Sequence, residues 1–80
     1  MTENTTYDKV HFAVMAIEAA AEKAHLPAKI IHDRLMQQGL IHNRLFEYYD
    51  LLHTQSLEWV ANDTLETLEN WEMNNKEDLK

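Results

Sequence analysis

The chain of 80 residues contains a single glycine, Gly39, and a single proline, Pro27. A β-rich fold of this length needs many tight turns, and glycine and proline are the residues that supply most of them. Alanine, leucine and glutamate, which favour helices, are abundant. The sequence therefore predicts an all-α fold, in which long helices are joined by a few short connections.

Hydrophobic periodicity predicts a compact bundle of about four helices, at approximately residues 6–24, 27–38, 41–53 and 55–71. Pro27 suits the first position of the second helix, and Gly39 suits a left-handed residue that ends it. A chain of this length forms one domain. We expect residues 6–72 to form that domain, residues 1–5 to be disordered and residues 73–80 to be a flexible acidic tail.

The first helix has apolar residues on two nearly opposite sides. Phe12, Met15 and Ala19 form the shorter side. A helix with two apolar sides is buried on both. It is predicted to be either the centre of the bundle or part of a homodimer interface through Phe12 and Met15. The longer stripe of this helix consists of Val10, Ala13, Val14, Ile17, Ala21 and Ala24. The predicted core residues of the later helices are Ile30, Ile31, Leu35, Leu45, Phe46, Tyr49, Leu52, Leu57, Val60, Ala61, Thr64, Leu68 and Trp71.

The net charge of −7 is unevenly distributed along the chain. Acids and bases balance over residues 1–46, whereas no lysine or arginine occurs from Glu47 to Asn75. Such a field disfavours nucleic acid and favours a partner with a basic surface. The chain has no cysteine, which excludes disulfides and thiolate metal sites. Without a signal sequence or a membrane-spanning apolar run, we expect a cytoplasmic protein that makes no membrane contact.

The fourth predicted helix carries a tryptophan among acids. At about 100° per residue, Trp59 lies roughly opposite the apolar stripe, on a face shared with Asp63, Glu66 and Glu69. An exposed tryptophan surrounded by carboxylates has the composition of a binding hot spot for a basic partner. Alternatively, Trp59 folds back under Tyr48 or the end of the first helix, because most tryptophans are buried.

The stretch from His53 to Ser56 interrupts an apolar run. Thr54 or Ser56 can cap the start of the following helix, and Gln55 can satisfy backbone groups at a bend. His53, near a helix carboxyl end, can bond a free carbonyl. We interpret this polar insert as a structural corner. The residues assigned to the corner are Tyr49, Asp50, Leu52, His53, Thr54 and Gln55.

The corner sequence Tyr49-Asp50-Leu51-Leu52-His53-Thr54-Gln55 resembles the signature of a small bacterial family of unassigned function, a domain of unknown function. Two further elements, Ile17-Glu18 and Leu35-Met36-Gln37-Gln38-Gly39, also resemble that family, over roughly residues 10–70. The resemblance implies that a protein similar to an ADP-ribosyltransferase is often encoded beside this one. It therefore implies a toxin with its neutraliser, or two parts of one complex. The family has no established activity that the resemblance could assign to these residues.

Two carboxylate-x-x-histidine pairs raise the possibility of a metal-binding bundle. The pairs are Glu22 with His25 and Asp50 with His53, and Glu18 lies one turn before Glu22. Di-iron bundles use this spacing on facing helices. The spacing is also common by chance, and His25 lies close to the loop before Pro27. We therefore predict no metal and no cofactor.

The sequence disfavours catalysis and nucleic-acid binding. Neighbours on a helix corner, such as Asp50, His53 and Ser56, rarely aim at one atom, and a bundle this small leaves little room for a pocket of several hundred cubic ångströms. Residues 27–53 have the proportions of a helix-turn-helix regulator. Their reading helix would present His42, Asn43 and Arg44, followed by the opposing charges of Glu47 and Asp50. The sequence thus favours a non-enzymatic, acidic protein-interaction module in a bacterial cytoplasm.

Overall fold

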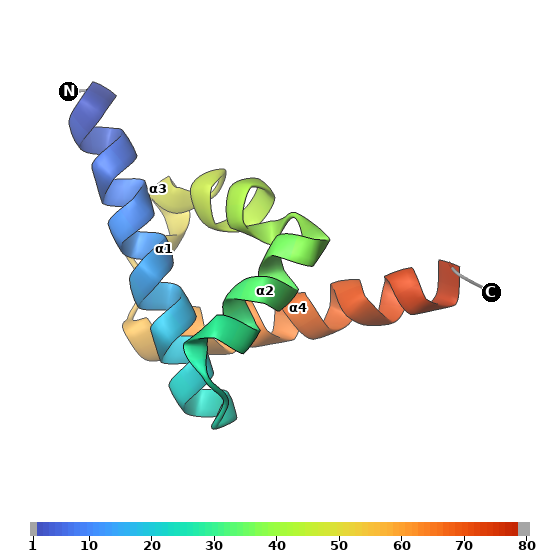
Figure 1. Ribbon diagram of the computed structural model, residues 1–80. Coiled ribbons are helices and arrows are strands. Elements are labelled where there is room, and N and C mark those ends of the chain that lie inside the picture. Colours follow the sequence, from blue (N-terminus) through green and yellow to red (C-terminus); the bar gives the residue numbers. More distant parts are fainter. Residues whose placement is uncertain (1, 79–80) are drawn as a thin grey trace.

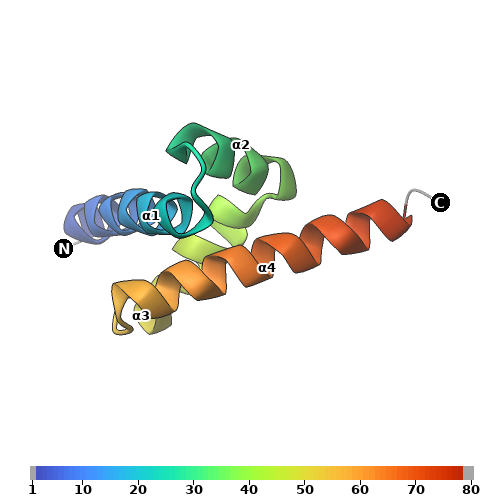
Figure 2. The same cartoon turned by 90° about the horizontal axis from the view of Figure 1, so that it is seen from below.

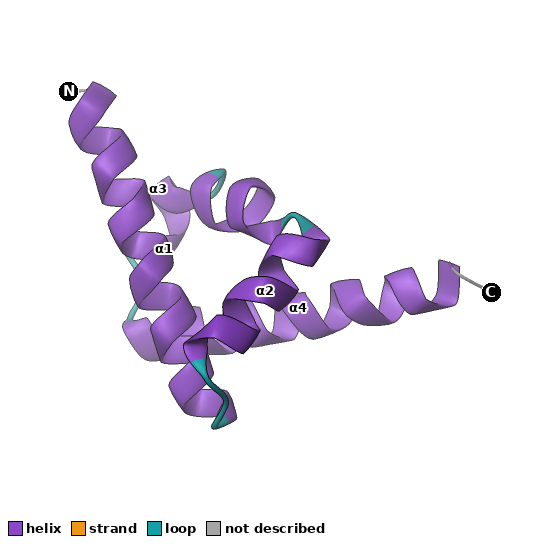
Figure 3. Cartoon of the chain, in the orientation of Figure 1, coloured by secondary structure: helices purple, strands orange, loops and turns teal. Residues whose placement is uncertain are grey.

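The computed structural model describes the backbone of residues 2–78 and the side chains of residues 6–74. The helical elements, in chain order, are α1 (Thr2–Ala24), α2 (Ala28–Gln38), the π-helix η1 (Ile41–Phe46), α3 (Tyr49–Leu52) and α4 (Leu57–Asp78). No strand occurs over the described backbone, which confirms the all-α prediction (Figure 3). A search of the same residues found no helix with the length and apolar character needed to span a membrane.

The two long helices α1 and α4 set the shape of the molecule. The C-terminal part of α1 packs on the first half of α4, and the helices then diverge (Figure 1). The segments α2 and η1 lie in the angle between them, while α3 returns the chain to the start of α4 (Figures 1 and 2). The overall dimensions are 45 × 25 × 20 Å.

Helix α1 buries mainly small residues. Ala16 and Ala20 are fully buried, so the backbones of neighbouring helices can approach closely. Val10 and Val14, which were predicted to be core, are each 47% exposed. That prediction is wrong because the alanines face the rest of the bundle and turn the valines outward. The second apolar side is covered within the chain only in part. The Phe12 and Tyr49 rings meet edge to face with centroids 5.6 Å apart, whereas Met15 is 39% exposed.

Three predicted core residues of the later helices are also exposed, namely Ile30, Leu57 and Trp71. Ile30 and Leu57 lie in the first turns of α2 and α4, where a helix has fewer neighbours to cover it. Trp71 lies in the C-terminal half of α4. That half of the helix has diverged from α1 (Figure 1). In α2 and α4, the periodicity was correct for the middle of the helix and wrong at the ends, where the helix leaves the core.

The predicted third helix, 41–53, is two segments rather than one. The Glu47 N–H donates to the His42 carbonyl at 3.1 Å, which is the i to i+5 bond of a π-helix. The wider turn lets Leu40, Ile41 and Leu45 all reach the core, where each is buried. A regular α-helix would spread these three positions around a larger arc, so core packing favours the π form.

Both long helices extend further than predicted. Helix α1 already includes residues 2–5, and α4 begins at Leu57 and includes residues 73–78. No glycine or proline follows Gly39 in the sequence, so nothing in the chain stops α4 near residue 71. The remaining residues of the predicted loose termini, Met1, Leu79 and Lys80, lie outside the described part of the chain.

Two left-handed residues end the first two helices. Gly39 has φ 71° and its N–H bonds carbonyl oxygens of the last turn of α2, which confirms the predicted stop. His25 has φ 59° and follows the last residue of α1. The Leu26 N–H then reaches back to the Ala21 carbonyl at 3.0 Å, which satisfies the end of α1. Pro27 is the N-cap of α2 rather than its first helical residue.

Candidate interaction surface on helix α4

The polar insert between α3 and α4 forms local hydrogen bonds. The Thr54 hydroxyl donates to the Leu51 carbonyl at 2.8 Å, at the end of α3. The Ser56 hydroxyl accepts the Trp59 N–H at 3.1 Å, which makes Ser56 the N-cap of α4. The Gln55 N–H donates to the Leu52 carbonyl at 3.1 Å. These bonds satisfy the backbone of a tight corner.

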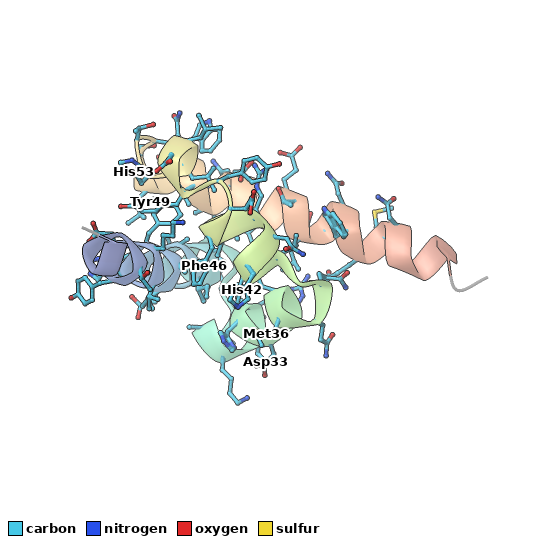
Figure 4. All side chains as sticks on the ribbon, turned by 90° about the horizontal axis from the view of Figure 1, so that it is seen from above. Asp33, Met36, His42, Phe46, Tyr49 and His53 are labelled. Atoms are coloured by element: carbon cyan, nitrogen blue, oxygen red, sulfur yellow. The ribbon has the colours of Figure 1, made fainter. Side chains whose placement is uncertain are left out.

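The remaining corner residues divide into two groups. Leu52 is 3% exposed and belongs to the core, and Tyr49 packs on Phe12 of α1. The His53 imidazole stacks on the Tyr49 ring with centroids 4.5 Å apart, and both lie at the α3 end of the molecule (Figure 4). The side chains of Asp50, His53, Thr54 and Gln55 are exposed. The corner thus joins α3 to α1 and to the core through Tyr49 and Leu52.

The four residues predicted to bind a partner differ in exposure. Trp59 is 44% exposed, and Glu66 and Glu69 are exposed on the same side of α4. The hypothesis that Trp59 is buried under Tyr48 does not agree with this exposure. Asp63, in contrast, accepts hydrogen bonds of 2.8 Å from Arg44 Nη2 at both carboxylate oxygens. Its charge is therefore already neutralised within the chain.

The Arg44–Asp63 pair joins two elements into one surface. The Arg44 guanidinium carbon lies 5.3 Å from the centre of the Tyr48 ring, and Tyr48 is 44% exposed. Leu51, three residues after Tyr48, is 67% exposed. On α4, Trp59 and Asp63 are four residues apart and so are neighbours on one face. We call these five residues the Trp59 surface: Arg44, Tyr48, Leu51, Trp59 and Asp63.

Sequence reasoning identified Trp59 and Asp63 but missed Tyr48 and Leu51 as parts of this surface. The link between the two pairs is Arg44, which is 19 residues from Asp63 along the chain. No sequence periodicity connects a π-helix to a distant α-helix. The sequence offered one signal for this link. No lysine or arginine occurs from Glu47 to Asn75, so any basic partner of Asp63 had to come from outside that range.

Almost all of the lysine and arginine side chains among residues 6–74 form ion pairs within the chain. Lys29 binds Asp33 at 2.9 Å, Arg34 binds Glu72 at 2.7 Å, and Lys23 lies 3.7 Å from Glu58. With Arg44 also paired, Lys9 is left as the one described lysine or arginine without an ionic partner. The described acids without an ionic partner are Asp8, Glu18, Glu22, Glu47, Asp50, Glu66 and Glu69.

The pairs on α2 also shift the ionisation of their acids. The Arg34 guanidinium, by hydrogen bonding, holds the pKa of Glu72 below its ordinary value, and Glu72 in turn raises the pKa of Arg34. A hydrogen bond from Lys29, followed by one with His32, lowers the pKa of the exposed Asp33. These acids therefore stay ionised, and the Arg34–Glu72 pair ties the distal part of α4 to α2.

Over the described part of the chain, the geometry assembles neither a metal site nor a DNA-reading helix. Among the described residues, no group of three or more histidines, cysteines or carboxylates is placed to hold a metal ion. Arg44, one of the three proposed base-reading residues, is turned toward α4 and bound to Asp63. The element that would enter a DNA groove is a six-residue π-helix, which does not present side chains as a recognition helix does.

In a comparison with known families, residues 11–71 match the family described as "Protein of unknown function (DUF3791)". The chain belongs to the DUF3791 family. The match covers all five elements at least in part and includes the whole Trp59 surface of this DUF3791 protein. Comparisons with curated proteins and with solved structures gave no match. The family description assigns no activity, so a function has to be inferred from the geometry of the surface.

Proposed function

We propose that this DUF3791 protein is a non-enzymatic interaction module that binds a partner protein through the Trp59 surface. The observation that carries the proposal is a half-exposed tryptophan on the same face of α4 as Asp63, whose pairing with Arg44 brings the exposed Tyr48 to the same part of the molecule. Tryptophan, tyrosine and arginine are the residues most enriched in binding hot spots. Exposed aromatic residues of this kind favour a role in binding a protein over a role as an ordinary solvent-facing surface.

The charges around the cluster favour a basic partner. Asp50 adjoins Leu51, and Glu66 lies three residues after Asp63 on α4. Neither carboxylate has an ionic partner among the described side chains. Unneutralised acids around an apolar centre attract a positively charged surface and speed its approach. Within this proposal, Glu66 and Glu69 belong to the acidic edge and Trp59 to the centre.

The resemblance of the corner sequence to a bacterial family suggests which protein the partner is. We propose an enzyme similar to an ADP-ribosyltransferase, encoded beside this protein in a bacterium, which the module neutralises or assists in the cytoplasm. Because the charges must be complementary, we expect the docking face of that enzyme to carry lysine or arginine. A nucleic-acid partner is disfavoured by the same carboxylates.

The test is affinity purification of the tagged protein from its native host, with mass spectrometry of what accompanies it. Trp59→Ala is compared with Trp71→Ala, because Trp71 is 47% exposed on the same helix but about 120° away by helical geometry. We expect one stoichiometric basic partner that is lost only with Trp59→Ala. Equal recovery with both variants, at equal thermal stability, would overturn the proposal.

A further inference from the structure

We propose that the hollow between the N-terminal half of α1 and the π-helix η1 is a binding site for a small zwitterion of the amino-acid class. The hollow has a volume of about 510 Å³. This size corrects the expectation that the bundle leaves little room for a pocket of several hundred cubic ångströms, and the volume of this solvent-open hollow lies in the range of small-molecule sites. The lining residues are Thr6, Lys9, His42, Asn43, Phe46 and Glu47.

Two opposite charges in the hollow carry the inference. Lys9 is the one lysine or arginine among side chains 6–74 that has no ionic partner. Glu47 lines the same hollow and also has no ionic partner within the described residues. Every other described lysine and arginine is paired, yet these two charges share one hollow without pairing to each other. A ligand that bridges them needs an anionic group for Lys9 and a cationic group for Glu47.

The uncharged wall of the hollow favours an apolar body between those two groups. Phe46 is partly buried, and its ring meets the His42 imidazole edge to face with centroids 4.9 Å apart. Both rings are on η1, on the face that lies beside α1 (Figure 4). The Asn43 amide is close to Gly39, where an added Cβ would lie 3.4 Å from Nδ2. An aromatic wall and a nearby amide suit an amino acid with an aromatic or large apolar side chain.

The π-helix gives the hollow its lining. Residues 42, 43, 46 and 47 all border the hollow, whereas Leu45 of the same segment is fully buried and Arg44 faces α4. Because a π-helix has about one extra residue per turn, this short segment can place side chains in the core, toward α4 and along the hollow. π-Helices are rare and are frequent at functional sites. Core packing explains Leu45, but it does not explain an unpaired lysine and glutamate on the outer side.

The same charges exclude several ligand classes. A nucleotide would bring several negative charges to a hollow that already contains Glu47, in a chain of net charge −7. A simple anion would leave Glu47 unpaired, and a simple cation would leave Lys9 unpaired. The site is separate from the Trp59 surface, because η1 presents Arg44 to α4 and Phe46 to the hollow. The inference therefore stands independently of the proposed partner binding.

Nuclear magnetic resonance titration of the ¹⁵N-labelled protein tests the site with three probes. The probes are L-phenylalanine, N-acetyl-L-phenylalanine, which has only the anionic group, and L-phenylalanine amide, which has only the cationic group. We expect L-phenylalanine to shift the amide signals of His42, Asn43, Phe46 and Glu47. Each single-charge probe should bind at least about tenfold more weakly, because one charge-assisted bond is lost.

Two substitutions with matched controls complete the test. Lys9→Gln and Glu47→Gln should each weaken L-phenylalanine binding about tenfold, because each removes one charged partner. Lys29→Gln and Glu66→Gln change the same residue types outside the hollow and should leave the affinity unchanged. Shifts confined to residues outside the hollow, no binding of L-phenylalanine, or equal binding of the N-acetyl probe would each overturn the inference.

Discussion

The Arg34 guanidinium binds the Glu72 carboxylate through two hydrogen bonds, 2.8 Å from Nε and 2.7 Å from Nη2, across 38 residues of sequence. Both side chains are about one-third exposed. Because a two-bond geometry orders the distal part of α4 on α2, we expect Glu72→Gln to lower the free energy of unfolding by about 1 kcal/mol. Chemical denaturation checks this. Glu66→Gln, an exposed acid of the same helix without an ion pair, should change stability by less than about 0.5 kcal/mol.

The same pair predicts how stability depends on pH. Arg34 lowers the pKa of Glu72 in the folded state, so the unfolded chain takes up a proton first as the pH falls. The contribution is complete above the ordinary glutamate pKa and is lost as the pH falls through the lower, folded value. The difference in unfolding free energy between the wild type and Glu72→Gln should therefore be constant from about pH 8 to about pH 6 and decrease steadily as the pH falls further. A difference that grew on acidification would contradict the ion-pair assignment.

Adjacent leucines of α3 should respond in opposite ways to truncation. Leu52 is 3% exposed in the core, whereas Leu51 is 67% exposed. Leu52→Ala should lower the free energy of unfolding by roughly 2–5 kcal/mol, because it removes buried methyl groups and leaves a cavity. Leu51→Ala should cost less than about 0.5 kcal/mol. Thermal and urea unfolding of both variants measures the contrast, and a loss below about 1 kcal/mol for Leu52→Ala would refute the position of α3.

The two left-handed residues should respond oppositely to exchange between glycine and a larger residue. Gly39→Ala places a Cβ on a residue with φ 71°, and we expect a loss of roughly 1–2 kcal/mol. His25→Gly removes the Cβ from a residue with φ 59°, and we expect a gain of about 0.5 kcal/mol after the added unfolded-state entropy of glycine. Differential scanning calorimetry gives both values. A loss of stability in His25→Gly would mean that the histidine ring contributes contacts of its own.

Partner binding at the Trp59 surface should depend on salt. The carboxylates around that surface are exposed, and attraction between exposed charges is screened at a distance of about 8–10 Å at physiological ionic strength. Affinity for the partner should therefore fall steeply between about 50 mM and 500 mM salt. Isothermal titration calorimetry at several salt concentrations measures this. Binding that is independent of salt would point instead to the apolar face of α1 near Met15.

The chain composition by itself determined the fold class and the main boundaries. One glycine and one proline leave few ways to build anything but helices, and those two residues mark both sides of α2. Local patterns also located the corner before α4, because hydroxyl side chains cap helices wherever the backbone needs an acceptor. The periodicity of residues 57–71 gave most of the buried face of α4, and it therefore gave Trp59 as outward facing.

Tertiary structure alone decided which helix faces are covered. Val10 and Val14 are apolar at core spacing, yet the closer approach allowed by Ala16 and Ala20 turns them to solvent. The π-helix exists because Leu40, Ile41 and Leu45 must reach one core together, and that requirement is set by α1 and α4 rather than by local sequence. Asp63 is bound by Arg44, which reaches it from η1. Each outcome depends on contacts between distant segments, whereas helix propensity and capping act over a few residues.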